Sequence, residues 1–188
     1  MDPEVVAAMA RWPGVPRVRG WLRLGARGQW LLRGEPIGNE ALRAFIGRNY
    51  QADAQGCWYF QNGPQRVDVE LERAPWIVRA DPAGWRTQVG TPLPPPRRVL
   101  LSDAGWFHFD TSIGPAALDD RDAAELLARL RCGGLPLPDD LLERWLAAGG
   151  SGAELPLVDA AAVTLDGVVV ERIGESAIED VLGFRRRP

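Results

Sequence analysis

The sequence predicts an α+β protein made of two related halves, each a curved antiparallel sheet of β-hairpins covered by a helix. Three observations support this fold class. Residues 67–72, "VDVELE", alternate apolar and acidic side chains, as a half-buried strand does. The order strand, turn, strand, connector, helix occurs in residues 20–46 and again in residues 97–127. A glycine turn followed at once, or one residue later, by a tryptophan occurs four times, before Trp30, Trp58, Trp85 and Trp106.

The first half is predicted to span residues 1–91. Its helix begins after Asn39, a residue type that caps helix N-termini, and one helical face carries Leu42, Phe45 and Ile46. Further strands are expected at residues 58–60, 67–72, 76–78 and 85–89. Strand alternation places Tyr59 on the face opposite Trp58 and Phe60.

A stiff linker is predicted at residues 92–96, "PLPPP", because proline-rich segments are extended spacers. The second half, residues 97–188, then carries a helix that is capped by Asp119 or Asp120. The apolar face of this helix is expected to contain Ala123, Leu126, Leu127 and Leu130.

Three further elements are expected in the second half. A helix at about residues 138–148 has no counterpart in the first half, so we interpret it as an insertion. The pair Asp166-Gly167 between β-branched runs predicts a hairpin turn. A short helix is expected over residues 176–182, with Ser176 and Glu179 as a capping box.

Composition limits the class of protein. The chain has 188 residues, 46% of them hydrophobic and 25% charged, which is typical of a globular domain with a core. No apolar run approaches the roughly 18 residues of a membrane span, and residues 1–16 lack the features of a secretory signal. We therefore expect a cytoplasmic protein that does not bind membranes. The net charge of −3 argues against general binding to nucleic acid, which depends on neutralising phosphates.

Metal and cofactor chemistry find little support in the sequence. Cys57, Cys132 and His108 are the cysteines and histidine of the chain, and their spacing is not that of a zinc site. We interpret both cysteines as small buried side chains, without a disulfide. All 22 basic side chains are arginines, so a phosphate loop of the GxxxxGK type is excluded. No metal, no cofactor and no catalytic residue is predicted.

Candidate binding residues follow the second tryptophan, in "WYFQNGPQR". Gln61, Asn62 and Gln65 carry amides that donate and accept hydrogen bonds, and Arg66 offers a planar fork of donors. An Asn-Gly turn explains part of this stretch without a ligand. The alternative is a polar ligand site with Trp58 or Trp76 as its floor, in a cleft between the halves.

Residues 48–78, "RNYQADAQGCWYFQNGPQRVDVELERAPWIV", with "GWLRL" before them and "VLGFRRRP" near the end of the sequence, resemble a bacterial family of uncharacterised proteins with a W-x-F-Q-N-G-P-Q-R-V core. More distantly, the connector at residues 34–37 and "APW" at residues 74–76 are similar to a second bacterial family of unknown function. That resemblance implies a duplicated α+β architecture and a C-terminal half like a pleckstrin-homology fold. It also implies a nucleobase-containing ligand at the domain interface and a role in signalling. In place of that family's acidic and basic pair, this sequence has Pro64, Gln65 and Arg66.

Three functional hypotheses follow. The leading one is a non-enzymatic module that binds a small ligand, for which nucleobase-containing compounds are candidates, or acts in signalling. The second is a protein-interaction or assembly module, in which the eight tryptophans and exposed sheet edges bind a protein partner or a second copy of the chain. The third is a hydrolase that uses His108 and Asp110, which requires the two side chains to hydrogen-bond in a cleft.

Overall fold

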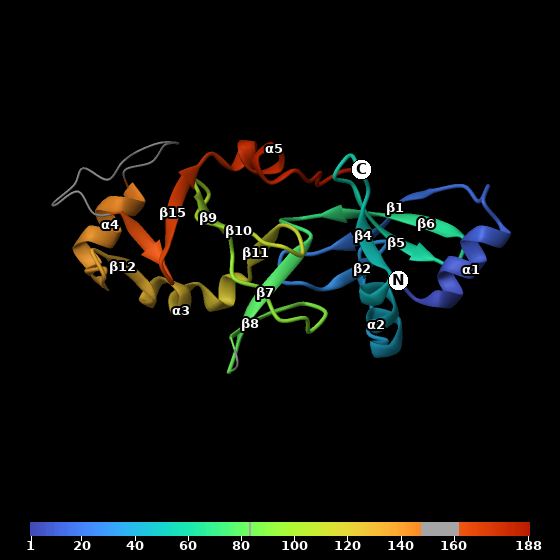
Figure 1. The fold of residues 1–188 in the computed structure, drawn as a ribbon, viewed down its shortest axis with the longest axis horizontal. Coiled ribbons are helices and arrows are strands. Elements are labelled where there is room, and N and C mark those ends of the chain that lie inside the picture. The colour runs from blue at the N-terminus through green and yellow to red at the C-terminus, as the bar shows by residue number, and fades with distance from the viewer. Residues whose placement is uncertain (83, 148–161) are drawn as a thin grey trace.

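The computed structural model describes residues 1–82, 84–147 and 162–188. It confirms the α+β class, with two mixed sheets and five α-helices in the described ranges. The molecule is elongated, with helix α1 (Pro3–Arg11) near one end and α4 (Asp139–Ala147) near the other (Figure 1). None of the helices in these ranges has the length and apolar character needed to cross a bilayer.

The first sheet has six strands in the order β3-β2-β1-β6-β5-β4. β1 and β6 pair in parallel, and the other neighbours pair antiparallel. Helix α2 (Glu40–Arg48) connects β3 to β4, and the side chain of Asn39 accepts a hydrogen bond from the Leu42 amide, as the predicted N-cap. The strands are β1 (Val18–Leu24), β2 (Trp30–Leu32), β3 (Glu35–Pro36), β4 (Tyr50–Ala52), β5 (Trp58–Asn62) and β6 (Gln65–Leu71).

The second sheet has nine strands in the order β13-β12-β14-β15-β9-β10-β11-β7-β8. It also contains parallel neighbours, β7 with β11 and β9 with β15, so both sheets are mixed and not wholly antiparallel as predicted. The strands are β7 (Trp76–Asp81), β8 (Gly84–Thr87), β9 (Arg98–Ser102), β10 (Phe107–Asp110), β11 (Ala116–Leu118), β12 (Leu130–Cys132), β13 (Leu135–Pro136), β14 (Val163–Leu165) and β15 (Val168–Ile173).

The boundary between the two sheets differs from the predicted linker. Strands β7 and β8, placed by the sequence in the half that spans residues 1–91, belong to the second sheet. Trp76, Ile77 and Val78 pair with residues 116–118 and are 9%, 1% and 0% exposed. The chain therefore passes from one sheet to the other between Leu71 and Trp76, and the proline-rich residues 92–96 connect two strands of one sheet.

Helix α4 lies within the predicted range, but it has a counterpart in the first sheet. The β2–β3 hairpin leads into α2, and the β12–β13 hairpin leads into α4, each with a proline in its second strand. Equivalent hydrogen bonds close the two units, from the Ile37 amide to the Trp30 carbonyl at 2.8 Å and from the Leu137 amide to the Leu130 carbonyl at 3.1 Å. The insertion prediction was therefore wrong about α4.

Helix α3 (Ala123–Ala128) is shorter than its predicted apolar face, because Leu130 already begins β12. The predicted cap Asp119 is correct in part: its carboxylate accepts from the Arg121 amide at the start of a 3₁₀ turn, residues 120–122, that precedes the helix.

Elements near the end of the sequence follow the prediction more closely. The predicted turn at Asp166-Gly167 joins β14 to β15, and both residues have positive φ, 51° and 85°. Helix α5 (Ile178–Leu182) follows a 3₁₀ turn at residues 175–177. The predicted capping box is not formed, since the Glu179 carboxylate instead accepts from the amide of Arg186.

Helix α1 was missed by the sequence analysis. The dipeptide Asp2-Pro3 is an available start signal, because proline suits the first turn of a helix.

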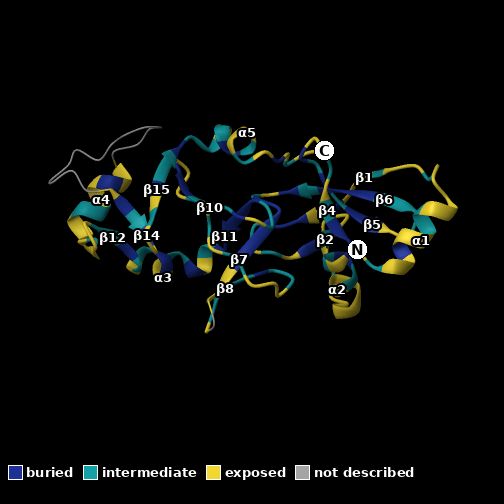
Figure 2. Cartoon of the chain, viewed as in Figure 1, coloured by how far each residue is buried: buried dark blue, intermediate teal, exposed yellow. Residues whose placement is uncertain are grey.

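One hydrophobic core runs through both sheets, and buried residues follow the strands across the middle of the molecule (Figure 2). Four aromatic rings meet where the sheets join: Trp30, Tyr50 and Trp58 from the first sheet and Trp76 from the second. The segment after α5 adds a second junction. Phe184 is fully buried, the Arg185 amide donates to the Gly56 carbonyl at 2.9 Å, and the Leu71 amide donates to the Arg186 carbonyl at 2.8 Å.

Candidate functional site

The predicted polar residues lie on the hairpin formed by β5 and β6, where Gln61 faces Arg66 and Asn62 faces Gln65 across the two strands. The Gln61 side chain is buried, 3% exposed, and its Nε2 donates to the Gly63 carbonyl of its own turn at 2.9 Å. Asn62 is exposed and Gln65 is half-buried. Gln61 therefore stabilises its own hairpin turn, and none of the three amides lines a described cavity.

Arg66 is held by other residues of the first sheet. Its Nη2 lies 2.6 Å from Asp53 Oδ2 and its Nε lies 2.9 Å from Asp68 Oδ1, and its guanidinium stacks 3.9 Å from the centre of the Tyr59 ring. Burial acts to lower the pKa of Arg66, but the hydrogen bonds to the two carboxylates outweigh it and raise that pKa. The planar fork predicted to recognise a ligand is thus engaged with carboxylates of the protein.

Asp68 is the centre of this charged cluster and is 2% exposed. It accepts from Arg17 at 2.8 Å and from Arg19 at 3.2 Å in addition to Arg66. Burial acts to raise the pKa of Asp68, and the hydrogen bonds from Arg17 and Arg66 overcome this and lower it. This buried carboxylate therefore links Arg17 and Arg19, at the start of β1, to Arg66 of β6.

Trp58 and Trp76 do come together, as the sequence predicts for a shared floor. They belong to different sheets, their ring centroids are 5.4 Å apart, and both line one cavity of about 520 Å³. We call it the aromatic cavity. Its walls are residues 50–54, Gly56 and Trp58 of the first sheet, Trp76 and residues 112–115 of the second, and Gly183.

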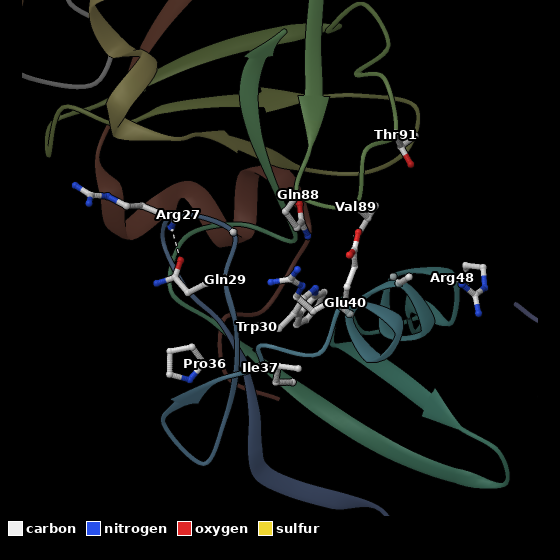
Figure 3. A pocket seen from close by; sticks show the side chains of 14 residues that line it. Arg27, Gln29, Trp30, Pro36, Ile37, Glu40, Arg48, Gln88, Val89 and Thr91 are labelled. Carbon is white, nitrogen blue, oxygen red and sulfur yellow. Dashed lines mark hydrogen bonds between the residues drawn. The ribbon is translucent and has the colours of Figure 1, made fainter.

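A larger cavity, of about 730 Å³, lies between the first sheet and the segment that follows β8. We call it the arginine cavity. Figure 3 shows Arg27 and Arg48 at opposite ends of it, Trp30 between them, and the Glu40 side chain directed toward Val89. It is lined by residues 27–30, Pro36, Ile37, Glu40, Arg43, Ala44, Gly47, Arg48, Gln88, Val89 and Thr91.

The two walls of the arginine cavity approach each other closely, and Gln88 of one wall is fixed by hydrogen bonds on its own side. The Gln88 side chain accepts from the Ile77 amide at 2.9 Å and donates to the Pro75 carbonyl at 3.2 Å. A Cβ added at Gly28 would lie 2.8 Å from Gln88 Cβ, and one added at Gly47 would lie 2.6 Å from Val89 Cγ1. Glycines at these two positions allow the first sheet and α2 to approach the segment after β8.

The three arginines of the cavity differ in their partners. Arg27 binds Asp120 through two hydrogen bonds of 2.8 and 2.9 Å, which raise the pKa of Arg27. Arg48 lies 3.2 Å from Asp2. The exposed side chain of Arg43 forms no hydrogen bond or ion pair with the residues that the structure describes. Arg43 is therefore available to an anion.

His108, the candidate base of the hydrolase hypothesis, is fully buried. Its Nε2 lies 3.5 Å from Glu175 Oε2, and the described residues include no hydrogen bond between His108 and Asp110. Glu175 also contacts Ser102, Arg73 and Arg186, so the carboxylate and not the imidazole is at the centre of this group. A triad needs the histidine between nucleophile and acid. The predicted His108–Asp110 pair is therefore corrected to a buried His108–Glu175 pair.

The sequence analysis did not identify the arginine cavity, because its lining residues come from four separate segments. One signal was present. The connector at residues 34–37, which carries the distant family resemblance, supplies Pro36 and Ile37 to the cavity.

Comparison with solved structures supports the fold. The chain is similar to a DUF1285 family protein from Silicibacter pomeroyi DSS-3, at 15% identity and a TM-score of 0.50, over 95% of this chain and 99% of that one. A DUF1285 family protein from Shewanella baltica OS155 also matches, at 17% identity and a TM-score of 0.38, over 56% of this chain and 88% of that one. No curated protein gives a significant match.

The family model DUF2944, which carries the description "Protein of unknown function (DUF2946)", matches residues 1–188. This match and the DUF1285 similarity confirm both resemblances, each at the level of a family of unknown function. The chain belongs to the DUF2944 family.

Proposed function

We propose that the protein is a non-enzymatic module that binds a small anionic ligand in the arginine cavity, with nucleobase-containing anions as the ligand class. The observation that carries the proposal is the guanidinium of Arg43, which has no partner among the described residues, in a cavity of about 730 Å³ between the first sheet and the segment after β8. Ligand sites commonly occupy about 300–1,000 Å³ and favour domain interfaces.

The chemistry of the walls fits recognition of such a ligand. Three arginines and one carboxylate, Glu40, line the cavity. Arg27 and Arg48 are paired with Asp120 and Asp2, so the attraction for an anion rests on Arg43. A guanidinium binds phosphate or carboxylate through paired donors. The edge of Trp30 and the side chain of Ile37 give a ring an apolar contact, and Gln29 offers an amide to its polar edge.

The position of the cavity supports a signalling role within this proposal. A ligand there contacts α2 of the first sheet and residues 88–91, which follow β8 of the second sheet. It would stabilise one arrangement of the two sheets over others by its differential affinity for them.

A thermal-unfolding screen tests the proposal. Adenine and guanine nucleotides are compared with the matching nucleosides, which lack the phosphate. At 100 times its dissociation constant a ligand stabilises by about 2.7 kcal/mol, which raises the Tm of a domain of this size by about 5–10 °C. Arg43→Ala should weaken nucleotide binding about tenfold to a hundredfold, the loss expected for a hydrogen bond to a charged group.

Arg97→Ala is the matched control, because Arg97 is exposed and does not line the cavity. It should leave the nucleotide response unchanged. A screen in which no nucleotide raises the Tm, or in which Arg43→Ala responds like the wild type, contradicts the proposal.

The protein-interaction hypothesis is a second candidate, supported by Trp12 and Trp21, which are 52% and 47% exposed. Arg33 stacks 3.9 Å from the centre of the Trp21 ring, as in many interface pairs of aromatic and guanidinium groups. Sedimentation at increasing concentration tests it, and self-association that Trp21→Ala abolishes would favour it over ligand binding.

A further inference from the structure

The turn between β2 and β3 holds an arginine in an unfavourable backbone conformation. Its two central residues, Arg33 and Gly34, have φ values of 52° and 91°. The equivalent turn between β12 and β13 has glycine at both positions, Gly133 and Gly134. Positive φ suits glycine but strains a residue that carries a Cβ. The other described non-glycine residue at positive φ is Asp166, a type that tolerates it. Strain of this kind is most often kept where the side chain serves function.

The side chain of Arg33 does not contribute to the core. It is exposed, and its guanidinium stacks 3.9 Å from the centre of the Trp21 ring. It forms no hydrogen bond or ion pair with the residues that the structure describes. Trp21 is itself 47% exposed. Stacking on the indole orients the guanidinium and leaves its N–H donors free. Arg33 therefore presents an oriented, unpaired cation to solvent.

Further arginines lie on the same side of the first sheet. Arg19, Trp21 and Arg23 alternate along β1, so they share one face. Arg19 is 66% exposed above Asp68, which is 2% exposed, and Arg23 is 49% exposed above Glu70, which is 33% exposed. An approaching partner therefore meets guanidinium groups before it meets carboxylates. We call this surface the arginine face, and define it by Arg19, Trp21, Arg23 and Arg33.

The arginine face is hollowed beside Trp21. A hollow of about 330 Å³ has Trp21, Arg23 and Arg33 in its lining, together with Gly20 and Gly34. Both glycines have positive φ, and a Cβ added at either would meet nothing within 4 Å. The hollow is therefore open to a side chain that approaches the indole and the guanidinium of Arg33 from outside.

We propose that the arginine face is a docking surface for an acidic segment of a partner protein. A carboxylate of the segment accepts hydrogen bonds from the free donors of Arg33, since a guanidinium matches a carboxylate through paired donors. Single-stranded nucleic acid fits less well, because bases stack on open aromatic faces and Arg33 covers one face of Trp21. The proposal extends the protein-interaction candidate above, and it does not depend on ligand binding in the arginine cavity.

Binding of a fluorescently labelled hexaglutamate peptide, measured by anisotropy at low salt, tests the proposal. Hexalysine and hexauridylate are the comparison probes. The wild type should bind hexaglutamate more tightly than either, and added salt should weaken this binding by screening. Arg33→Gln should weaken it about twofold to fivefold, the loss expected for one exposed ion pair. No binding of hexaglutamate, or tighter binding of hexauridylate, overturns the proposal.

Arg129→Gln is the matched control, because it changes the net charge equally. Arg129 also stacks over a tryptophan, at 5.2 Å from the centre of the Trp85 ring, but it already pairs with Asp166. This variant should bind hexaglutamate as the wild type does. Arg43→Ala should also do so, which keeps the result separate from the nucleotide screen. Equal affinities in Arg33→Gln and wild type, or equal losses in Arg33→Gln and Arg129→Gln, overturn the proposal.

Arg33→Gly separates a binding role of Arg33 from a structural one. It should bind hexaglutamate as weakly as Arg33→Gln. It should also unfold at a higher temperature than Arg33→Gln, because glycine adopts positive φ without strain. An Arg33→Gly protein that is less stable than Arg33→Gln would show that the turn is not strained, and would overturn the assignment of Arg33 to a docking surface.

Discussion

Acid should weaken the protein through Glu175, which joins the 3₁₀ turn before α5 to the core. Burial alone would raise the pKa of this carboxyl, but its contacts with His108, Ser102 and Arg186 lower it from 4.5 to about 2. The side chain is 21% exposed. Because each pKa unit corresponds to about 1.36 kcal/mol, ionised Glu175 contributes about 3 kcal/mol to folding at neutral pH.

The sign of the pH dependence follows from linkage. A carboxyl with a lowered folded-state pKa stabilises the protein fully above its unfolded pKa, here 4.5, and loses this contribution as pH falls toward about 2. Glu175→Gln should therefore lower the free energy of unfolding by about 3 kcal/mol at pH 7. At pH 3 the gap between wild type and variant should be about half as large.

Urea denaturation of both proteins at pH 7 and pH 3 measures this gap. The control is Glu70→Gln, since Glu70 is 33% exposed and paired with the half-exposed Arg23; it should cost less than about 1 kcal/mol at pH 7. A loss below about 1 kcal/mol for Glu175→Gln at pH 7, or a gap that stays constant down to pH 3, would refute the reasoning.

Two further predictions concern the first sheet. Asp68→Ala should lower the free energy of unfolding by about 2 kcal/mol, because it removes a buried acceptor from Arg66. The loss is limited because Arg66 still pairs with Asp53. A urea midpoint equal to that of Glu70→Gln would contradict this. Gly56→Ala places a Cβ 2.4 Å from the Gly183 carbonyl, whereas Gly34→Ala, also at positive φ, meets nothing within 4 Å. Thermal unfolding should therefore show that Gly34→Ala lowers the free energy of unfolding by about 1 kcal/mol, through backbone strain alone. Gly56→Ala should lower it by about 1–3 kcal/mol more, because its Cβ also clashes. Equal losses in the two variants would show that the close approach does not matter.

Local features of the fold could be predicted because they depend on near neighbours. Asn39 caps α2 through an amide three residues away, and the Asp166-Gly167 turn joins adjacent strands. The alternation in residues 67–71 is reproduced for Val67, Val69 and Leu71, which are buried. The acidic positions were expected to be exposed, and Asp68 is not, because three arginines cover its carboxylate.

Non-local pairing could not be predicted in the same way. The apolar run Trp76–Val78 shows that a strand is buried, but not that its partner is β11, about forty residues later. The same limit affected the candidate site. The arginine side chain is a residue type that binds phosphate well. In this protein, however, the guanidinium of Arg66 is already paired with the carboxylates of Asp53 and Asp68. The spacing of Arg66 and Asp68 on one strand face was an available warning.

The assignment of β7 to the second sheet has a consequence for synthesis on the ribosome. The first sheet has all its strands once Leu71 has emerged, but Trp76, Ile77 and Val78 wait for residues 116–118 before they gain a neighbour on that side. During this interval the nascent chain presents an apolar hairpin with an open edge, the kind of segment that chaperones bind and that aggregates when translation stalls. Slow translation of residues 79–115 should therefore lower the yield of folded protein more than slow translation of residues 25–60.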